Sequence, residues 1–251
     1  MDRREAGQQF TYGPIVEERQ DAYGELVVAY LEGQGRVREI VERDDGFIEA
    51  TDGPAGYFAP VRAWPFAERR GLRFIRGRVL DVGCGAGRVA LELQARGREV
   101  VAIDVSPLTV EVARRRGVHD VRVMAFEKVG RQLGRFDTVV MYGNNFGLFG
   151  GKAKAERLLG HLRPLAKRIV ASTRDPYDTE DEAHLAYHER NRRRGRMAGQ
   201  LRLRVRYRDY ASAWFDYLIV SPEELEVLVG GTGWRVSRVI EGDPLYVAVL
   251  E

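Results

Sequence analysis

The segment VLDVGCGAGR, residues 79–88, constrains the fold of this 251-residue chain more than any other. Its apolar start has the composition of a buried β-strand, glycines then follow at every second position, and an amphipathic helical pattern begins at Arg88. Glycines between a strand and a helix let a ligand approach the backbone, and the free N–H groups of a helix start attract an anionic group. We therefore expect a strand, a ligand-binding turn and a helix, in this order.

The spacing of these glycines excludes two common nucleotide-binding motifs. A dinucleotide fingerprint needs glycine at the sixth position counted from Gly83, and that position holds Arg88. A phosphate-binding P-loop needs Gly-Lys followed by Ser or Thr, whereas the only Gly-Lys pair, Gly151-Lys152, is followed by Ala153. The turn therefore serves another class of ligand.

From residue 78 onward, short β-branched runs alternate with amphipathic helical patterns, which is typical of a parallel sheet covered by helices on both faces. Ser106 is a helix cap before Pro107, and Gly97 and Gly117 stand where helices end. We predict strands at 78–82, 99–104, 120–124, 136–141 and 167–172, and helices at 88–96, 107–116 and 152–162.

The C-terminal region predicts a helix followed by an antiparallel hairpin. The helix begins at Ser221-Pro222 and ends at Gly230-Gly231. Apolar runs follow at 234–240 and 245–250, and the short segment Gly242-Asp243-Pro244 separates them. We expect this hairpin to close one edge of the sheet.

Two segments, residues 1–77 and residues 174–220, do not fit the alternation. We therefore divide the chain into an N-terminal segment, 1–77, and a domain, 78–251, that contains the second of them. Residues 1–77 are rich in aromatic residues and predict a helical N-terminal lid. Residues 174–220 predict a cap inserted into the second domain, with a charged helix at 179–194 and two paired strands at 201–208 and 214–220. In the first of these strands apolar residues alternate with four arginines, so one strand face is in water.

The pattern Asp81-x-Gly83-x-Gly85-x-Gly87 resembles motif I of the class I S-adenosylmethionine-dependent methyltransferases. Asp104, at the end of the second predicted strand, matches the family carboxylate that binds both ribose hydroxyls. The resemblance implies an α/β fold of Rossmann-like type, with a seven-stranded, mostly parallel sheet and an antiparallel C-terminal hairpin. It also implies S-adenosyl-L-methionine as the cofactor and S-adenosyl-L-homocysteine as its product.

The resemblance assigns the cofactor to motif I and to the strand ends that follow it: Asp81, Gly83, Cys84, Gly85, Gly87, Asp104, Val105, Tyr142 and Gly143. The chain departs from the family after the third strand, where Ala125-Phe126-Glu127 replaces the common Gly-Asp-Ala whose acid binds the adenine amine. Either Phe126 stacks on or flanks the adenine while its neighbours donate backbone hydrogen bonds, or Glu127 takes over the acidic role. Tyr23, on the first predicted helix, either covers the cofactor or belongs to a plain core.

Methyl transfer from a sulfonium is an in-line displacement, so the site has to align the nucleophile, exclude water and in some enzymes remove a proton. The reaction demands no metal. Asn145 follows the fourth predicted strand, and we expect it to face the transferred methyl group because ligands bind at the carboxyl ends of parallel strands.

The predicted charged helix of the cap carries the candidates for acid–base work. His184 and His188 are one helical turn apart, and His188 is the candidate general base; a metal-binding pair and a plain helix surface are the alternatives. His184 and Tyr187 are also candidates for binding the substrate. Arg174 either clamps a carboxylate or phosphate of the substrate or pairs with Asp175 or Asp178.

Basic and acidic residues nearly balance, 40 against 37, for a formal net charge of +3. Nine arginines nevertheless fall between residues 190 and 208. A solvated strand face, an RNA-binding face and a dimer interface are all compatible with this cluster.

These patterns predict a methyltransferase that acts on an O, N or C nucleophile of a small molecule, since two lid regions imply an enclosed site. An RNA or protein methyltransferase that uses the arginine-rich cap is the alternative, and a non-catalytic S-adenosylmethionine-binding protein is the second. Residues 1–5 lead into polar sequence rather than a secretory signal, no apolar run is long enough to span a membrane, and Cys84 is the single cysteine. We therefore expect a cytoplasmic monomer or homodimer without membrane contact.

Overall fold

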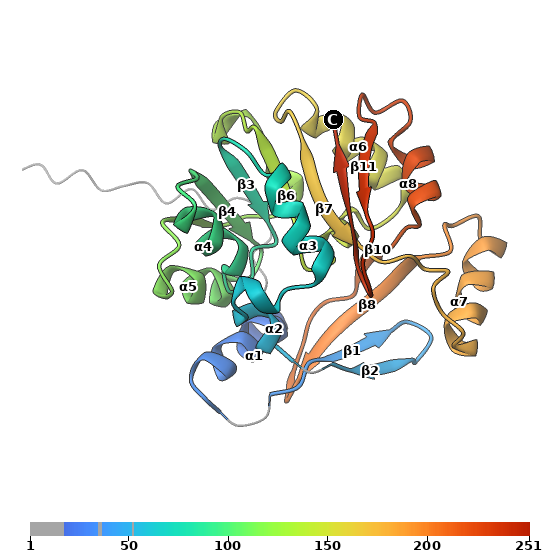
Figure 1. Ribbon diagram of the computed structural model, residues 1–251. Coiled ribbons are helices and arrows are strands. Elements are labelled where there is room, and N and C mark those ends of the chain that lie inside the picture. The colour runs from blue at the N-terminus through green and yellow to red at the C-terminus, as the bar shows by residue number, and fades with distance from the viewer. Residues whose placement is uncertain (1–17, 35–36, 52) are drawn as a thin grey trace, which may run out of the picture.

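A computed structural model describes residues 18–34, 37–51 and 53–251 of the chain (Figure 1). Residues 1–17 of the predicted lid, and with them the polar segment 1–5 used to exclude a secretory signal, lie outside the described residues.

A seven-stranded sheet forms the centre of the fold, in the order β11-β12-β7-β6-β3-β4-β5. The inner pairs are parallel, and the hairpin β11–β12 adds the antiparallel edge, with β12 paired to β7. This confirms the predicted sheet, with strand ends shifted by two residues or fewer in the parallel part. The strands are β3 (Val79–Val82), β4 (Val100–Asp104), β5 (Asp120–Val123), β6 (Thr138–Met141), β7 (Ile169–Thr173), β11 (Val236–Ile240) and β12 (Tyr246–Leu250).

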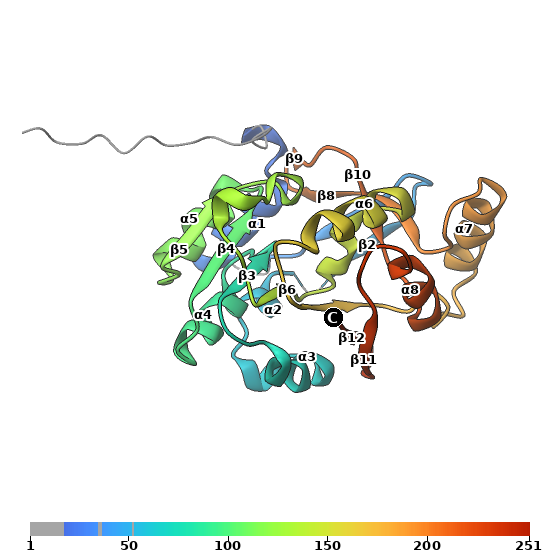
Figure 2. The same cartoon turned by 90° about the horizontal axis from the view of Figure 1, so that it is seen from above.

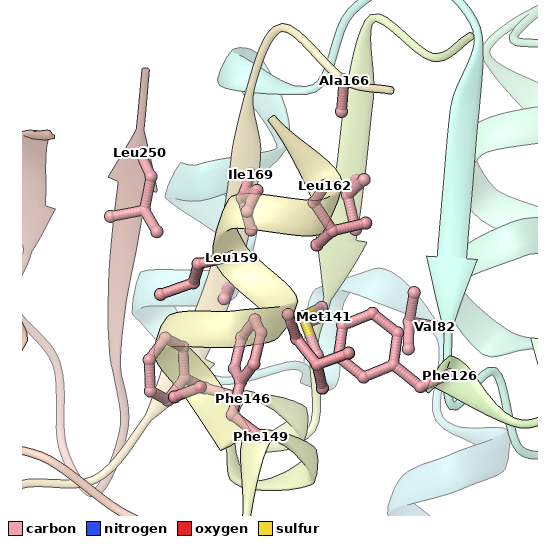
Figure 3. Packing of buried hydrophobic residues seen from close by; sticks show 14 of the residues in the cluster. Val82, Phe126, Met141, Phe146, Phe149, Leu159, Leu162, Ala166, Ile169 and Leu250 are labelled. Carbon is pink, nitrogen blue, oxygen red and sulfur yellow. The ribbon is translucent and has the colours of Figure 1, made fainter. Parts of the chain in front are cut away.

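Helices cover both faces of this sheet, which is why its strands read as nearly continuous apolar runs. One face packs against α3 (Phe66–Gly71), α4 (Arg88–Ala95) and α5 (Pro107–Arg115), and the other against α6 (Lys152–Leu162) and α8 (Pro222–Val229). Figure 2 shows α3 and α4 on one side of the strands and α6 and α8 on the other. In Figure 3, Leu159 and Leu162 of α6 pack over Met141 and Ile169.

A second sheet corrects the expectation of a purely helical lid. Its order is β10-β8-β1-β2, in which β1 (Ile40–Arg43) and β2 (Ile48–Ala50) come from the N-terminal segment. β8 (Gln200–Tyr207), β9 (Tyr210–Ala211) and β10 (Phe215–Leu218) are the strands of the predicted cap. Val41 lies opposite Val205, so the lid and the cap are joined by a β ladder into one covering layer.

This covering layer lies at the carboxyl ends of the parallel strands. Helix α1 (Ala22–Leu31) begins at Asp21, whose Oδ2 accepts a 2.7 Å hydrogen bond from Ser106 Oγ just beyond β4. On the other side Tyr217 Oη of β10 donates to the carbonyl of Asn144 just beyond β6. The remaining elements are η1 (Glu18–Gln20), α2 (Ala55–Phe58), η2 (Val61–Ala63), η3 (Leu72–Phe74), η4 (Phe126–Lys128), η5 (Arg131–Leu133), η6 (Asn145–Phe149) and α7 (Glu182–Arg193).

Acidic side chains neutralise much of the arginine cluster between residues 190 and 208. Arg204 makes a bidentate pair with Glu42 of β1, at 2.8 and 2.9 Å, and Arg206 shares the same carboxylate. Arg202 pairs with Asp216, while Glu189 pairs with arginines of its own helix. The strand face is therefore a cross-strand network of ion pairs.

None of the helices in the described part of the chain combines the length and the apolar character that crossing a membrane would require.

Candidate functional site

The turn between β3 and α4 has the backbone conformation that its glycines predict. Gly83, Gly85 and Gly87 have φ values of +70°, +51° and +79°, a region that disfavours residues with a Cβ atom. The nearest atom to a Cβ on Gly85 would be Tyr23 Oη, at 3.2 Å. Among the described residues, Tyr23 alone comes within 4 Å of this position.

Asp104 lies directly beside this turn, at the end of β4. Its Oδ2 accepts a hydrogen bond from Gly85 N at 2.9 Å and its Oδ1 one from Ser106 N at 3.0 Å. The carboxyl is 9% exposed, and burial raises its pKa although both backbone N–H groups lower it. Each oxygen keeps a lone pair that can accept a further bond, so the carboxylate is suited to receive two hydroxyl groups.

Asp81, at the end of β3, adds a second buried carboxyl to the site. Its Oδ2 has no hydrogen-bond partner among the described residues, and the side chain is 2% exposed. Burial raises the pKa of this carboxyl to about 7, against the lowering influence of Arg88. A buried oxygen without a partner is costly, so a donor group of a bound ligand fits here.

Asn145 holds the turn rather than facing its open side. Its Nδ2 donates to the carbonyls of Val82 and Gly83, at 3.0 and 2.7 Å, and uses both amide hydrogens in doing so. The expected position of Asn145 against a transferred methyl group therefore needs correction: this side chain positions the glycine turn.

Glu68 on α3 connects the same turn to the ends of β6 and β7. Its Oε2 accepts from Arg88 at 2.8 Å, and its Oε1 accepts from Gly143 N at 2.6 Å and from Ser172 Oγ at 2.9 Å. Sequence reasoning missed Glu68, because a glutamate followed by two arginines in a short helix has the pattern of a solvated surface.

Tyr23 of the lid and Val105, directly after β4, both lie beside the turn. Tyr23 lies on the first turn of α1, which Asp21 attaches to the β4–α5 connection, and its hydroxyl is the atom nearest the open side of Gly85. Val105 follows Asp104 and leaves 43% of its surface exposed, an apolar contact beside a polar carboxylate. Both positions agree with a role in binding a ligand on the turn.

Four other predicted cofactor residues have side chains occupied elsewhere. Phe126 is buried in the core beside Val82 and Met141, 5.3 Å from the Phe149 ring (Figure 3), so its ring is no stacking surface for adenine. Glu127 pairs with Lys154 at 2.5 Å. The Tyr142 ring packs against Trp64 on the α3 side of the sheet. The Cys84 thiol is buried, and this burial raises the pKa of the thiol well above its ordinary value. At these positions only backbone atoms are candidates for ligand contact.

Three half-buried tyrosines and one glutamate lie between the covering layer and the strand ends. Tyr23 and Tyr57 have ring centroids 5.3 Å apart, and Tyr57 Oη donates to Glu39 Oε2 at 3.1 Å. The Tyr217 ring packs over Gly147, where a Cβ would lie 2.1 Å from a ring carbon. We call Tyr23, Tyr57, Tyr217 and Glu39 the tyrosine cluster. Only Tyr23 was expected at the site, since the cluster joins residues far apart in the chain.

The candidates on α7 do not reach the glycine turn. Figures 1 and 2 both place α7 at the far edge of the molecule from β3 and α4. His184 Nδ1 lies 2.9 Å from Arg43 Nη1, and Tyr187 Oη donates to Asp44, so these side chains attach α7 to the β1–β2 hairpin. His188 is 4% exposed, and its Nδ1 has no partner in the described chain. The geometry does not support His188 as the general base, nor His184 and Tyr187 as substrate contacts.

Arg174 remains near the site. It is exposed, follows β7, and lies close enough to Tyr217 to lower the pKa of that phenol, which burial raises. No group of three or more His, Cys, Asp or Glu side chains in the described residues has the geometry of a metal centre. The alternative of a metal-binding histidine pair on α7 gains no support from His184, whose Nδ1 faces Arg43 Nη1.

The buried imidazole of His188 should make the protein less stable in mild acid. Burial lowers its pKa from 6.5 to about 4, so the unfolded chain binds a proton that the folded chain excludes. This contribution is complete above about pH 6.5 and is lost as the pH falls toward 4; it amounts to about 2 kcal/mol. Chemical denaturation at pH 7 and pH 5 measures it. Between these pH values the free energy of unfolding should fall less in His188→Gln than in wild type. In His119→Gln, which replaces an exposed histidine, it should fall as much as in wild type. Equal losses in wild type and His188→Gln would contradict this account.

Known proteins are similar to this chain in sequence and in fold. A family model described as a methyltransferase domain matches residues 79–167. A SAM-dependent methyltransferase from Bacteroides fragilis, solved in complex with S-adenosyl-L-homocysteine, superimposes with a TM-score of 0.79 and 27% identity, over 95% of this chain and 97% of that one.

Two curated relatives match a shorter segment. A magnesium-protoporphyrin O-methyltransferase of Rhodobacter capsulatus is 42% identical over 67 residues, which are 25% of this chain and 30% of the relative. A ubiquinone biosynthesis O-methyltransferase of Xanthomonas oryzae pv. oryzae is 43% identical over 68 residues, 25% of this chain and 28% of the relative. The chain therefore matches less than a third of the length of these two relatives.

Proposed function

We propose that this protein is an enzyme that methylates a small molecule. The premise is that residues 79–167 form a methyltransferase domain in a chain with the class I S-adenosylmethionine-dependent fold. The observation that carries the proposal is the pair formed by the open glycine turn and Asp104, joined by the hydrogen bond from Gly85 N to Asp104 Oδ2.

The residues at the turn fit S-adenosyl-L-methionine. Asp104 would accept the two ribose hydroxyls, and the unpartnered Oδ2 of Asp81 would accept a donor from the amino acid part of the cofactor. Gly85 would let that part lie against the backbone, with Val105 beside the adenine. When bound, the cofactor supplies a methyl group on a positively charged sulfur. The chain's own residues hold it, exclude water and align the acceptor.

The covering layer supports a small acceptor over a macromolecule. Asp21 fixes α1 to the β4–α5 connection, and Tyr217 fixes β10 to the loop after β6, so the strand ends are covered from two sides. Five of the nine arginines that an RNA-binding face would use are paired with Glu42, Asp216 or Glu189. A side chain already paired with a carboxylate gains less from a phosphate.

Calorimetric titration tests the proposal. S-adenosyl-L-methionine and S-adenosyl-L-homocysteine should each bind one site per chain, whereas NAD⁺ and ATP, whose phosphates have no P-loop or dinucleotide fingerprint to bind, should not. Absence of heat with both sulfur compounds would rule out the function. Binding without formation of S-adenosyl-L-homocysteine from any amine, hydroxyl or carboxylate acceptor would instead favour a non-catalytic binding protein.

A further inference from the structure

The Glu39 carboxylate is a buried acid without an ionic partner. Its side chain is 7% exposed, and no basic group of the described residues forms a salt bridge with it. Oε2 accepts hydrogen bonds from Tyr57 Oη and Thr51 Oγ1, both at 3.1 Å, while Oε1 accepts none from the described residues. Burial raises the pKa of this carboxyl, and Glu49 adds to the shift. A buried carboxylate is costly without a cation, so Glu39 needs a reason to be there.

Glu39 and the glycine turn border the same tyrosine cluster. Tyr57, which donates to Glu39, has its ring centroid 5.3 Å from that of Tyr23, and the Tyr23 hydroxyl covers the open side of Gly85. Tyr217 closes the cluster at the loop after β6, where its hydroxyl donates to Asn144. The acid therefore lies across the tyrosines from the proposed methyl donor site, where an acceptor would have to bind.

The electrostatic surroundings of the cluster favour a cation. Burial raises the pKa values of Tyr23 and Tyr57, and nearby acidic groups, Glu39 for both and Asp104 for Tyr23, raise them further. Among the described residues Arg174, beside Tyr217, opposes these acids, and Arg116 Nη1 lies 3.4 Å from the backbone carbonyl of Tyr57. Tyrosine faces attract cations, and a carboxylate binds an ammonium group by a charge-assisted hydrogen bond. An anionic or purely neutral acceptor would leave the acid without a counterion.

We infer that the methyl acceptor is a small molecule with a protonated amine, which the Glu39 carboxylate binds within the tyrosine cluster. The inference rests on the proposed function and specifies its substrate class. The two O-methyltransferase relatives match only 67 and 68 residues, 25% of this chain, so their names do not decide the acceptor.

The reaction balances with the groups at hand. The ammonium group transfers one proton to the Glu39 carboxylate, which frees the nitrogen lone pair. That pair forms the new nitrogen–carbon bond with the methyl group, while the carbon–sulfur bond breaks and its electron pair stays on sulfur. The product leaves as a methylated ammonium ion, and Glu39 returns its proton to water. A buried acid of raised pKa holds this proton more readily than an exposed one.

Titration of the protein saturated with S-adenosyl-L-homocysteine tests the inference. Benzylamine and methylammonium are the cationic probes, benzyl alcohol is the neutral isostere and benzoate the anion. We expect at least one amine to bind about tenfold or more tightly than benzyl alcohol, and benzoate not to bind. Glu39→Gln, which keeps the shape and removes the charge, should weaken amine binding by about 10- to 100-fold. Glu226→Gln, at an exposed glutamate of α8, should leave it unchanged.

The outcomes separate the two proposals. A protein that does not bind S-adenosyl-L-homocysteine overturns the proposed function at the first titration. A protein that binds it but shows no preference for either amine over benzyl alcohol overturns the amine inference alone, and so does a preference that survives in Glu39→Gln. If its melting temperature shows that Glu39→Gln does not fold, the preference of the wild-type protein for an amine over benzyl alcohol decides the amine inference by itself.

Discussion

Replacing Asp104 with asparagine should weaken the binding of S-adenosyl-L-methionine by about 30- to 1000-fold. The carboxylate is proposed to accept two ribose hydroxyls, and hydrogen bonds to a charged group contribute about 1.5–3 kcal/mol each, so losing the charge costs about 2–4 kcal/mol. An asparagine also has one acceptor oxygen where Gly85 N and Ser106 N each need one. Its amide nitrogen would face one of these N–H groups and displace the turn.

Titration calorimetry on the folded variant measures this loss. Asp120→Asn is the matched control, because Asp120 on β5 is partly exposed and pairs with Arg122 away from the turn. A decrease smaller than about threefold in Asp104→Asn would show that the carboxylate does not bind the cofactor, since even one neutral hydrogen bond contributes about 0.5–1.5 kcal/mol. Because burial raises the pKa of Asp104, wild-type affinity should also fall as the pH falls through that raised value.

The parallel sheet was predictable because its strands are buried on both faces and therefore read as short, unbroken apolar runs. The α6 helix was predicted with its observed bounds, 152–162, since Gly151 precedes it and a proline follows soon after its end. The glycine turn was predictable because φ values such as the +79° of Gly87 tolerate almost no other residue. In these elements local pattern and tertiary position agree.

Of the second sheet, the pairing of β8 with β10 was predictable from local pattern, whereas the β1–β2 strands and their pairing with β8 were not. β1 has four residues, two of them charged, and its register with β8 joins Glu42 to Arg204 across more than half of the chain. For the same reason helical spacing showed that His184 and His188 share a face of α7, but not where α7 lies. Glu39 and Glu68 look like surface acids in sequence, and only tertiary contacts with Tyr57 and with Arg88 reveal their burial.

The ion pair between Glu68 and Arg88 should make Glu68→Gln one of the most destabilising single changes in the protein. The Glu68 side chain is fully buried and that of Arg88 is 12% exposed, so removing the carboxylate leaves a guanidinium in a dry environment, over the Trp64 ring. Breaking a buried pair at one partner costs about 3–5 kcal/mol. Near Tm a change of this size lowers Tm by about 6–20 °C in a chain of this length. Calorimetric melting measures it, with Glu92→Gln, whose glutamate forms a partly exposed helical pair with Arg96, as the control.

A double variant distinguishes the charge from the packing. If the loss in Glu68→Gln comes from the uncompensated guanidinium, Glu68→Leu combined with Arg88→Met should be more stable than Glu68→Leu alone, because no buried charge remains. The double variant would still lack the acceptor for Gly143 N and Ser172 Oγ, which Glu68 Oε1 provides at the ends of β6 and β7. We therefore expect it to regain much of its melting temperature and to bind S-adenosyl-L-methionine more weakly than wild type. If the losses of stability in the two single variants add up in the double variant, Glu68 acts by packing alone. If the double variant recovers both its stability and its binding of S-adenosyl-L-methionine, the pair does not position the site.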